Sequence, residues 1–271
     1  MLRLDRLVIG IAITAGMLAV TGCNRLTFVK PNLSKMEVEQ VREPVRARDN
    51  AAVKARASAQ QLVSAASTAY QQGDVATAEK NARAALKADP QSIDAHTLMG
   101  AISAQRGRNA ESGEWLKKAA QLSQGRPAEA ANYGTWLCSN GDAAGSLQYF
   151  DYAAQAQAGA DRAASLANAG ACALGAGMEA RADTYLQQAL QYDPNSTLAL
   201  ESLASLSLKR GRAMDARAYI QRRLSVTPIS AAALTTAADI ESRLGDANAA
   251  AFYQQRLRTE FPNTNAPSGG K

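Results

Sequence analysis

The chain has 271 residues, of which 46% are hydrophobic but only 5% aromatic, and its formal net charge is +6. Abundant alanine with no alternating run rich in valine and isoleucine favours thin, closely packed helices, and argues against a β-sandwich or a doubly wound sheet. The basic residues do not form the continuous basic face with interleaved aromatics that a nucleic-acid-binding protein needs, so we expect no nucleic-acid partner.

The first 22 residues predict a signal peptide for export. Arg3 and Arg6 precede an apolar run from Leu7 to Val20, and small residues follow just before Cys23. The run is shorter than the about 20 residues that a membrane-spanning helix requires. This segment is therefore expected to be a targeting signal that is not part of the folded protein.

Residues 18–23, Leu-Ala-Val-Thr-Gly-Cys, resemble the lipobox of bacterial lipoproteins. The resemblance implies that the Cys23 thiol receives a diacylglyceryl group, that the preceding peptide is cut, and that the new amino group is acylated. Several acyl chains anchor a protein stably without a spanning helix. In these lipoproteins an aspartate after the cysteine signals inner-membrane retention, so Asn24 favours the periplasmic face of the outer membrane. The alternatives are a plain signal peptide with an incidental Cys23 and an uncleaved anchor.

Residues 23–57 are expected to be a lipidated N-terminus and a basic tether. The stretch contains Pro31 and Pro44, is rich in charge, and could be helical from Arg46 onward. Its basic excess could contact anionic lipid headgroups, which would add about 1 kcal/mol for each close charge.

From residue 58 to residue 262 a template of two short helices joined by a glycine turn occurs six times. It advances in steps of 34 residues, with one step of 36, and places its turns at Gly73, Gly107, Gly141, Gly177, Gly211 and Gly245. The positions seven residues before and five residues after each glycine are all small: Ala66, Gly100, Gly134, Gly170, Ala204 and Ala238, then Ala78, Ser112, Ser146, Ala182, Ala216 and Ala250. Small contact residues let two helices cross closely, so these positions predict the crossing point of each pair.

Proline ends the second helix in four of the six units, at Pro90, Pro194, Pro228 and Pro262, because it disfavours the helical region for the preceding residue. Period and residue types resemble the tetratricopeptide repeat, whose length is about 34 residues. The resemblance implies an all-α fold, a right-handed superhelical solenoid of six such repeats. Residues 263–271 are expected to be a short disordered tail.

Catalytic and metal-binding patterns are missing from this sequence. Its single histidine, His96, falls on a predicted first helix, where a packing or surface role is commoner than catalysis. Cysteines and acids have no metal-ligand spacing, and no glycine-rich phosphate loop follows a strand. We therefore expect no enzyme, no cofactor and no small-molecule substrate.

Cys138 and Cys172 are 34 residues apart, on the first helices of the third and fourth repeats. Export to the periplasm permits oxidation, and adjacent first helices run side by side. A disulfide also needs Cα atoms within about 7 Å, which helix spacing does not guarantee. We expect a bridge, with two small buried thiols as the alternative.

Asn132 and Asn168 lie nine residues before their turn glycines, where the first helix of a tetratricopeptide repeat faces the concave groove. In such proteins an asparagine there often hydrogen-bonds the backbone of an extended peptide. Asparagine is a poor residue for a helix interior, which favours a binding role; a hydrogen bond between helices is the alternative. Tyr133 is expected in the core, and Trp136 either in the core or beside the groove.

The segments Asn-Tyr-Gly-Thr-Trp-Leu-Cys, residues 132–138, and Asn-Ala-Gly-Ala-Cys-Ala-Leu, residues 168–174, are similar to the type IV pilus biogenesis and stability family of PilF and PilW pilotin lipoproteins. This resemblance implies an outer-membrane lipoprotein that binds the pilus secretin subunit and other pilus assembly proteins. It would help the secretin reach the outer membrane and multimerise, or stabilise pili. A first repeat without large residues and a long tether depart from the family. The alternatives are a generic periplasmic scaffold for envelope assembly and an enzyme or enzyme activator.

Overall fold

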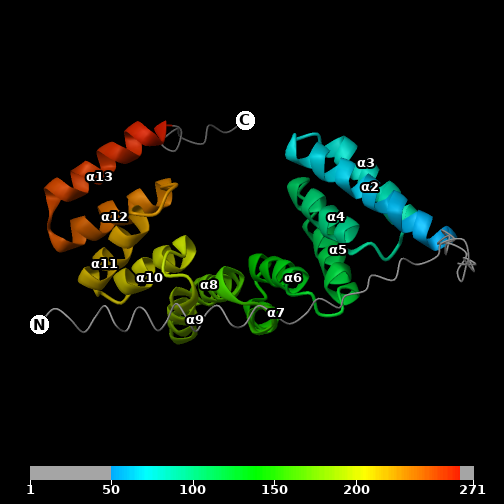
Figure 1. The fold of residues 1–271 in the computed structure, drawn as a ribbon. Helices are drawn as coiled ribbons and strands as arrows, with labels where there is room; N and C mark the ends of the chain where they lie inside the picture. Colours follow the sequence, from blue (N-terminus) through cyan, green and yellow to red (C-terminus); the bar gives the residue numbers. More distant parts are fainter. Residues whose placement is uncertain (1–49, 263–271) are drawn as a thin grey trace, which may run out of the picture. The chain divides into compact units, whose positions relative to one another are not determined.

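The structure, a computed structural model, describes residues 50–262. Within that range every regular element is helical, in twelve helices that Figure 1 shows as successive pairs. They are α2 (Ala51–Gln71), α3 (Val75–Ala88), α4 (Ile93–Gln105), α5 (Asn109–Leu122), α6 (Pro127–Ser139), α7 (Ala143–Ala156), α8 (Gly159–Gly175), α9 (Glu179–Tyr192), α10 (Thr197–Lys209), α11 (Ala213–Leu224), α12 (Ala231–Leu244) and α13 (Ala247–Glu260). The predicted signal peptide, Cys23, most of the tether and the tail lie outside the described residues.

Each helix pair turns at one of the predicted glycines. Gly141, between α6 and α7, has φ 88°, a left-handed conformation that glycine adopts without steric cost. The next residue, Asp142, then caps α7, because its carboxylate accepts a hydrogen bond from the Gly145 N–H at 2.8 Å. The other five turn glycines also have positive φ. The repeat grid therefore located all six turns from sequence.

The small residues that the grid predicted at the helix crossings are all buried. A Cβ added to Gly100 would lie 2.7 Å from the Leu116 side chain, and one added to Gly170 would lie 2.5 Å from Leu186. Gly134 is nearly as confined, since its Cβ would meet the Ser146 carbonyl oxygen at 3.2 Å. These contacts confirm where the two helices of each repeat cross.

The first helix starts earlier than the predicted repeat boundary at residue 58. α2 begins at Ala51, and the Asn50 side chain caps it by accepting a hydrogen bond from the Val53 N–H at 2.9 Å. The last residues of the predicted tether are therefore part of the first repeat's helix. This agrees with the expectation that the tether could be helical near its end.

The junction before the third repeat has the irregular turn that its sequence indicates. Gln124 and Gly125 both have positive φ, 47° and 97°, and Pro127 then opens α6 at a position where its missing N–H costs no hydrogen bond. The Tyr152 hydroxyl of α7 donates a hydrogen bond to the Gly125 carbonyl. A side chain from the third repeat thus holds the loop that precedes this repeat, where other repeats have an Asp-Pro turn.

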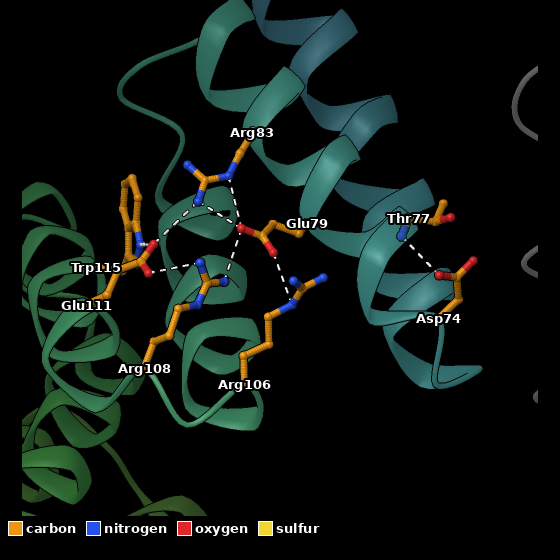
Figure 2. A network of polar contacts seen from close by, with 8 residues as sticks. All are labelled: Asp74, Thr77, Glu79, Arg83, Arg106, Arg108, Glu111 and Trp115. Carbon is orange, nitrogen blue, oxygen red and sulfur yellow. Dashed lines mark hydrogen bonds and ion pairs between the residues drawn. The ribbon is translucent and has the colours of Figure 1, made fainter.

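A network of charged side chains joins the first two repeats. Figure 2 shows that Glu79 of α3 contacts Arg83 of its own helix, and Arg106 and Arg108 from the turn between α4 and α5. The nitrogen–oxygen distances are 2.8, 3.1 and 3.0 Å, respectively. Arg108 also reaches Glu111 at 3.1 Å. The hydrogen bond from Arg83, with help from Arg108 and against the effect of burial, lowers the pKa of the Glu79 carboxyl.

The same type of contact recurs between the fourth and fifth repeats. Asp183 of α9 pairs with Arg210, at the same 27-residue separation as Glu79 and Arg106. Within residues 130–178, all of which the structure describes, no ion pair joins two side chains. Charged side chains in this range instead bond uncharged partners: Arg162 Nε–H donates to the Ala154 carbonyl at 2.7 Å, and the Tyr185 hydroxyl donates to the Asp151 carboxylate at 2.8 Å.

Candidate binding groove

A pocket of about 410 Å³ opens between α4, α5 and α6. Its lining consists of Thr97, Gly100, Ala101, Ala104, Asn109, Ser112, Leu116, Asn132, Thr135, Trp136, Ser139 and Asn140. None of these residues is charged. Small side chains from α4 leave the space open, and amide and hydroxyl groups stand among the apolar ones. We call this the α4–α6 pocket; its mixture of apolar surface and a few polar groups is typical of ligand sites.

Trp136 forms one wall of the α4–α6 pocket and is fixed on three sides. Its Nε1–H donates a hydrogen bond to the Asn109 carbonyl at 2.9 Å. Its ring is stacked on Tyr133 with an interplanar angle of 8°, and it lies over Gly113 of α5. Trp136 therefore packs between two repeats and also lines the α4–α6 pocket, and its role in binding a partner stays a prediction. Tyr133 is buried, as predicted.

The floor of the α4–α6 pocket is the crossing of α4 and α5. Leu116 lies against Gly100, and the buried Ser112 hydroxyl donates a hydrogen bond to the Gly100 carbonyl at 2.8 Å. This bond uses the only side-chain donor of Ser112. The floor is accordingly mostly apolar.

The rim carries polar groups that have no internal partner. The exposed Asn132 side chain makes no hydrogen bond with any described residue, and the Thr97 hydroxyl is buried without a partner among residues 50–262. Asn140, in contrast, donates through Nδ2 to the Trp136 carbonyl at 2.8 Å. Asn132 is thus free to bind a partner from its place on α6.

Asn168 lies on α8, in the next repeat, and does not line the α4–α6 pocket. It is half-buried, and its side chain forms no hydrogen bond within residues 50–262. The alternative that these asparagines join neighbouring helices therefore finds no support at either position. Their role in binding a peptide stays a prediction.

A disulfide joins Cys138 of α6 to Cys172 of α8, with Cα atoms 5.8 Å apart. The Ser146 hydroxyl lies 3.1 Å from the Cys172 sulfur, so the second helix of the third repeat also contacts the bridge. Because α6 carries Asn132 and α8 carries Asn168, the disulfide fixes the two asparagines relative to each other. It does so in the part of the chain that has no ion pairs.

His96 has a packing role in the structure. It is 6% exposed, its Nε2–H donates to the Pro90 carbonyl at 3.0 Å, and its ring lies 5.4 Å from that of Trp115. Burial lowers its pKa. No group of three or more histidine, cysteine, aspartate or glutamate residues within 50–262 is placed to hold a metal ion. Among the described helices, none combines the length and apolar character needed to cross a membrane.

Several residues of the α4–α6 pocket were missed from sequence. Ala101 and Ala104 read as ordinary helix-forming alanines, and Asn109 and Asn140 as residues next to turns. One signal was available, since Ala101 and Asn132 occupy groove-facing positions of neighbouring first helices on the repeat grid. The pocket itself could not be predicted, because it depends on the placement of three helices.

Comparison with known proteins supports the fold. No protein-family model matches the chain, and no curated protein matches it by sequence. Among solved structures, PilW, described as a widely conserved type IV pilus biogenesis factor, is 26% identical with a TM-score of 0.69, over 76% of this chain and 95% of that one. PilF of Pseudomonas aeruginosa is 21% identical with a TM-score of 0.67, over 78% and 95%.

A tetratricopeptide repeat protein from Parabacteroides merdae also matches, at 13% identity and a TM-score of 0.61, over 76% of this chain and 79% of that one. Such low identity shows the shared architecture alone. The chain is therefore a tetratricopeptide repeat protein, all-helical over residues 50–262, and its likeness to PilW supports the type IV pilus biogenesis family that its sequence resembles.

Proposed function

We propose that this chain is an outer-membrane lipoprotein pilotin of type IV pilus biogenesis. In this proposal it binds the pilus secretin subunit and promotes the secretin's outer-membrane localisation and multimerisation, or stabilises assembled pili. The observation that carries the proposal is the likeness to PilW over 95% of that chain at 26% identity. Membrane attachment would depend on lipidation of Cys23, which lies outside the described residues.

The groove would act by holding an extended segment of the partner. Asn132 and Asn168 each offer an unpaired amide, which can donate to a backbone carbonyl and accept from a backbone N–H. Trp136 offers apolar surface that is already fixed by its contacts with Asn109 and Gly113, so little side-chain entropy is lost on binding. The action is binding alone, and no covalent step is needed.

The test is the amount of detergent-resistant secretin multimer in outer membranes of a strain that lacks this chain. Complementation with the wild-type chain should restore the multimer, and Cys23→Ala should restore it only in part, because the anchor places the chain at the outer membrane. Unchanged multimers with lost pili would point to pilus stabilisation. Unchanged multimers with unchanged pili would contradict the proposal and favour a general periplasmic scaffold.

A further inference from the structure

We propose that the α4–α6 pocket is a socket for one large apolar side chain of a protein partner, and that the partner segment around this side chain is extended and uncharged. The inference deepens the proposed function and rests on it for the partner, since it names the class of segment that the groove accepts. It assigns a specificity role to Ala104, Asn132 and Trp136.

The size and surface of the pocket suit one large apolar side chain. Its volume of about 410 Å³ falls within the roughly 300–1,000 Å³ of sites that bury small ligands. Leu116 in the floor and the ring of Trp136 in the wall provide apolar surface, and Ala101 and Ala104 are too small to fill the space beside them. Burying one aromatic or branched side chain there would remove apolar surface from water on both partners.

The uncharged lining of the pocket favours an uncharged partner segment. None of the twelve residues that line the pocket is charged. A charged side chain placed in this groove would lose its hydration without gaining a counter-ion, which is unfavourable. The groove therefore discriminates against acidic and basic partner segments, and favours an uncharged one.

The unpaired Asn132 amide at the rim favours an extended partner segment. Asn132 stands at the rim with its amide unpaired, and a carboxamide matches the donor and acceptor of one peptide unit. A partner in extended conformation exposes such units beside each side chain, whereas a helix satisfies them internally. One apolar side chain in the pocket and one backbone unit at Asn132 thus belong to an extended segment.

The test uses a displayed library of random 12-residue peptides, selected on the full-length chain purified in detergent. Ala104→Leu fills the mouth of the pocket from an exposed position, and Ala218→Leu makes the same change on the exposed face of α11. Both variants should have the same urea midpoint of unfolding as the wild type, because neither alanine is buried. Selected peptides should contain a large apolar residue within an uncharged stretch.

Isothermal titration of synthetic copies should show at least tenfold weaker binding to Ala104→Leu and no change for Ala218→Leu. Replacing the apolar residue of the peptide by aspartate should weaken binding as strongly. Recovery of charged peptides, of no peptide, or of peptides that bind Ala104→Leu normally would overturn the proposal. So would peptides that resemble residues 24–49, or a wild-type dimer that Ala104→Leu dissociates, because the occupant would then be this chain itself.

Binding of the soluble part of the secretin subunit to the same variants separates this inference from the proposed function. If peptides require an open pocket but the secretin does not bind, the socket stands and the proposed partner is wrong. If the secretin binds wild type and Ala104→Leu alike, the proposed function survives and the socket is wrong for that partner.

Discussion

The indole of Trp136 lies directly over Gly113 of the preceding repeat. A Cβ added at Gly113 would stand 2.2 Å from Cζ2 of the ring, far inside van der Waals contact. Trp136 can therefore pack across the repeat boundary and reach the Asn109 carbonyl only because position 113 has no side chain. This pair fixes the wall of the groove.

Gly113→Ala is expected to destabilise the protein by about 1–3 kcal/mol, the usual cost of overpacking, because the ring must move. Gly175→Ala at the end of α8 is the matched control, since a Cβ there meets nothing within 4 Å. That substitution should stabilise by about 0.4–1 kcal/mol, through the reduced entropy of the unfolded chain. Urea unfolding followed by circular dichroism measures both. Equal effects of the two substitutions would contradict the packing described for Trp136.

Loss of the disulfide should lower stability. The Cys138–Cys172 bridge closes a segment whose ends are 34 residues apart, and such a cross-link stabilises a protein by about 2–4 kcal/mol. Adding a thiol reductant should therefore lower the urea midpoint of the wild type. The double variant Cys138→Ser with Cys172→Ser should have this lower urea midpoint without reductant, and adding reductant should not change it. A reductant effect of the same size in both proteins would show that the bridge contributes nothing.

Arg223, near the end of α11, is a buried charge. It is 4% exposed, donates to a Glu201 carboxylate oxygen at 2.6 Å, and also donates to the Val226 and Pro228 carbonyls. Arg223→Ala should cost about 2–3 kcal/mol, because these charge-assisted hydrogen bonds vanish together.

The matched control is Arg256→Ala, which breaks a more exposed pair with Glu260 and should cost at most about 0.5 kcal/mol. Thermal and urea unfolding of both variants give the comparison. A small effect at Arg223 would mean that the loop of Val226 and Pro228 does not need its guanidinium.

Acid should weaken the network shown in Figure 2. The hydrogen bond from Arg83, aided by Arg108, lowers the pKa of Glu79 below its ordinary value of 4.5, so the folded chain binds the proton less readily than the unfolded chain. The stabilisation is then present above pH 4.5 and is lost as the pH falls through the folded pKa.

Glu79→Gln should therefore be less stable than wild type at pH 7. The difference in the free energy of unfolding between the two proteins should vanish as the pH approaches 3. Glu260→Gln serves as a control for a more exposed carboxylate, and its loss of stability relative to wild type at pH 7 should be smaller. Unfolding midpoints measured from pH 7 to pH 3 test this. If the stability difference between wild type and Glu79→Gln does not depend on pH, the ionised Glu79 carboxylate is not its cause.

Local chemistry made most of the fold predictable. A glycine at each turn and small residues at each helix crossing depend only on backbone conformation and close approach, so Gly141, Gly134 and Ser146 could be placed from their spacing. The order of the helix pairs followed from the repeat period. The start of α2 at Ala51 was harder to predict, because a charged, alanine-rich stretch reads equally well as tether or helix.

The site was less predictable, because it depends on distances between repeats. The spacing of Cys138 and Cys172 raised the possibility of a bridge, but only the distance between α6 and α8 could decide it. The contact of Trp136 with Gly113 joins residues from different repeats, and no local pattern indicates it. The α4–α6 pocket likewise arises from what three helices leave unfilled.

Affinity of the chain for the soluble periplasmic part of the secretin subunit tests the central claim most directly. The proteins to compare are wild type, the groove variant Asn132→Ala with Asn168→Ala, and the control Asn248→Ala on the exposed surface of α13. If the groove binds the partner, the groove variant should bind at least tenfold more weakly, and the control should match wild type. Equal affinity of all three proteins would show that the partner binds elsewhere or not through these asparagines, and would contradict the account.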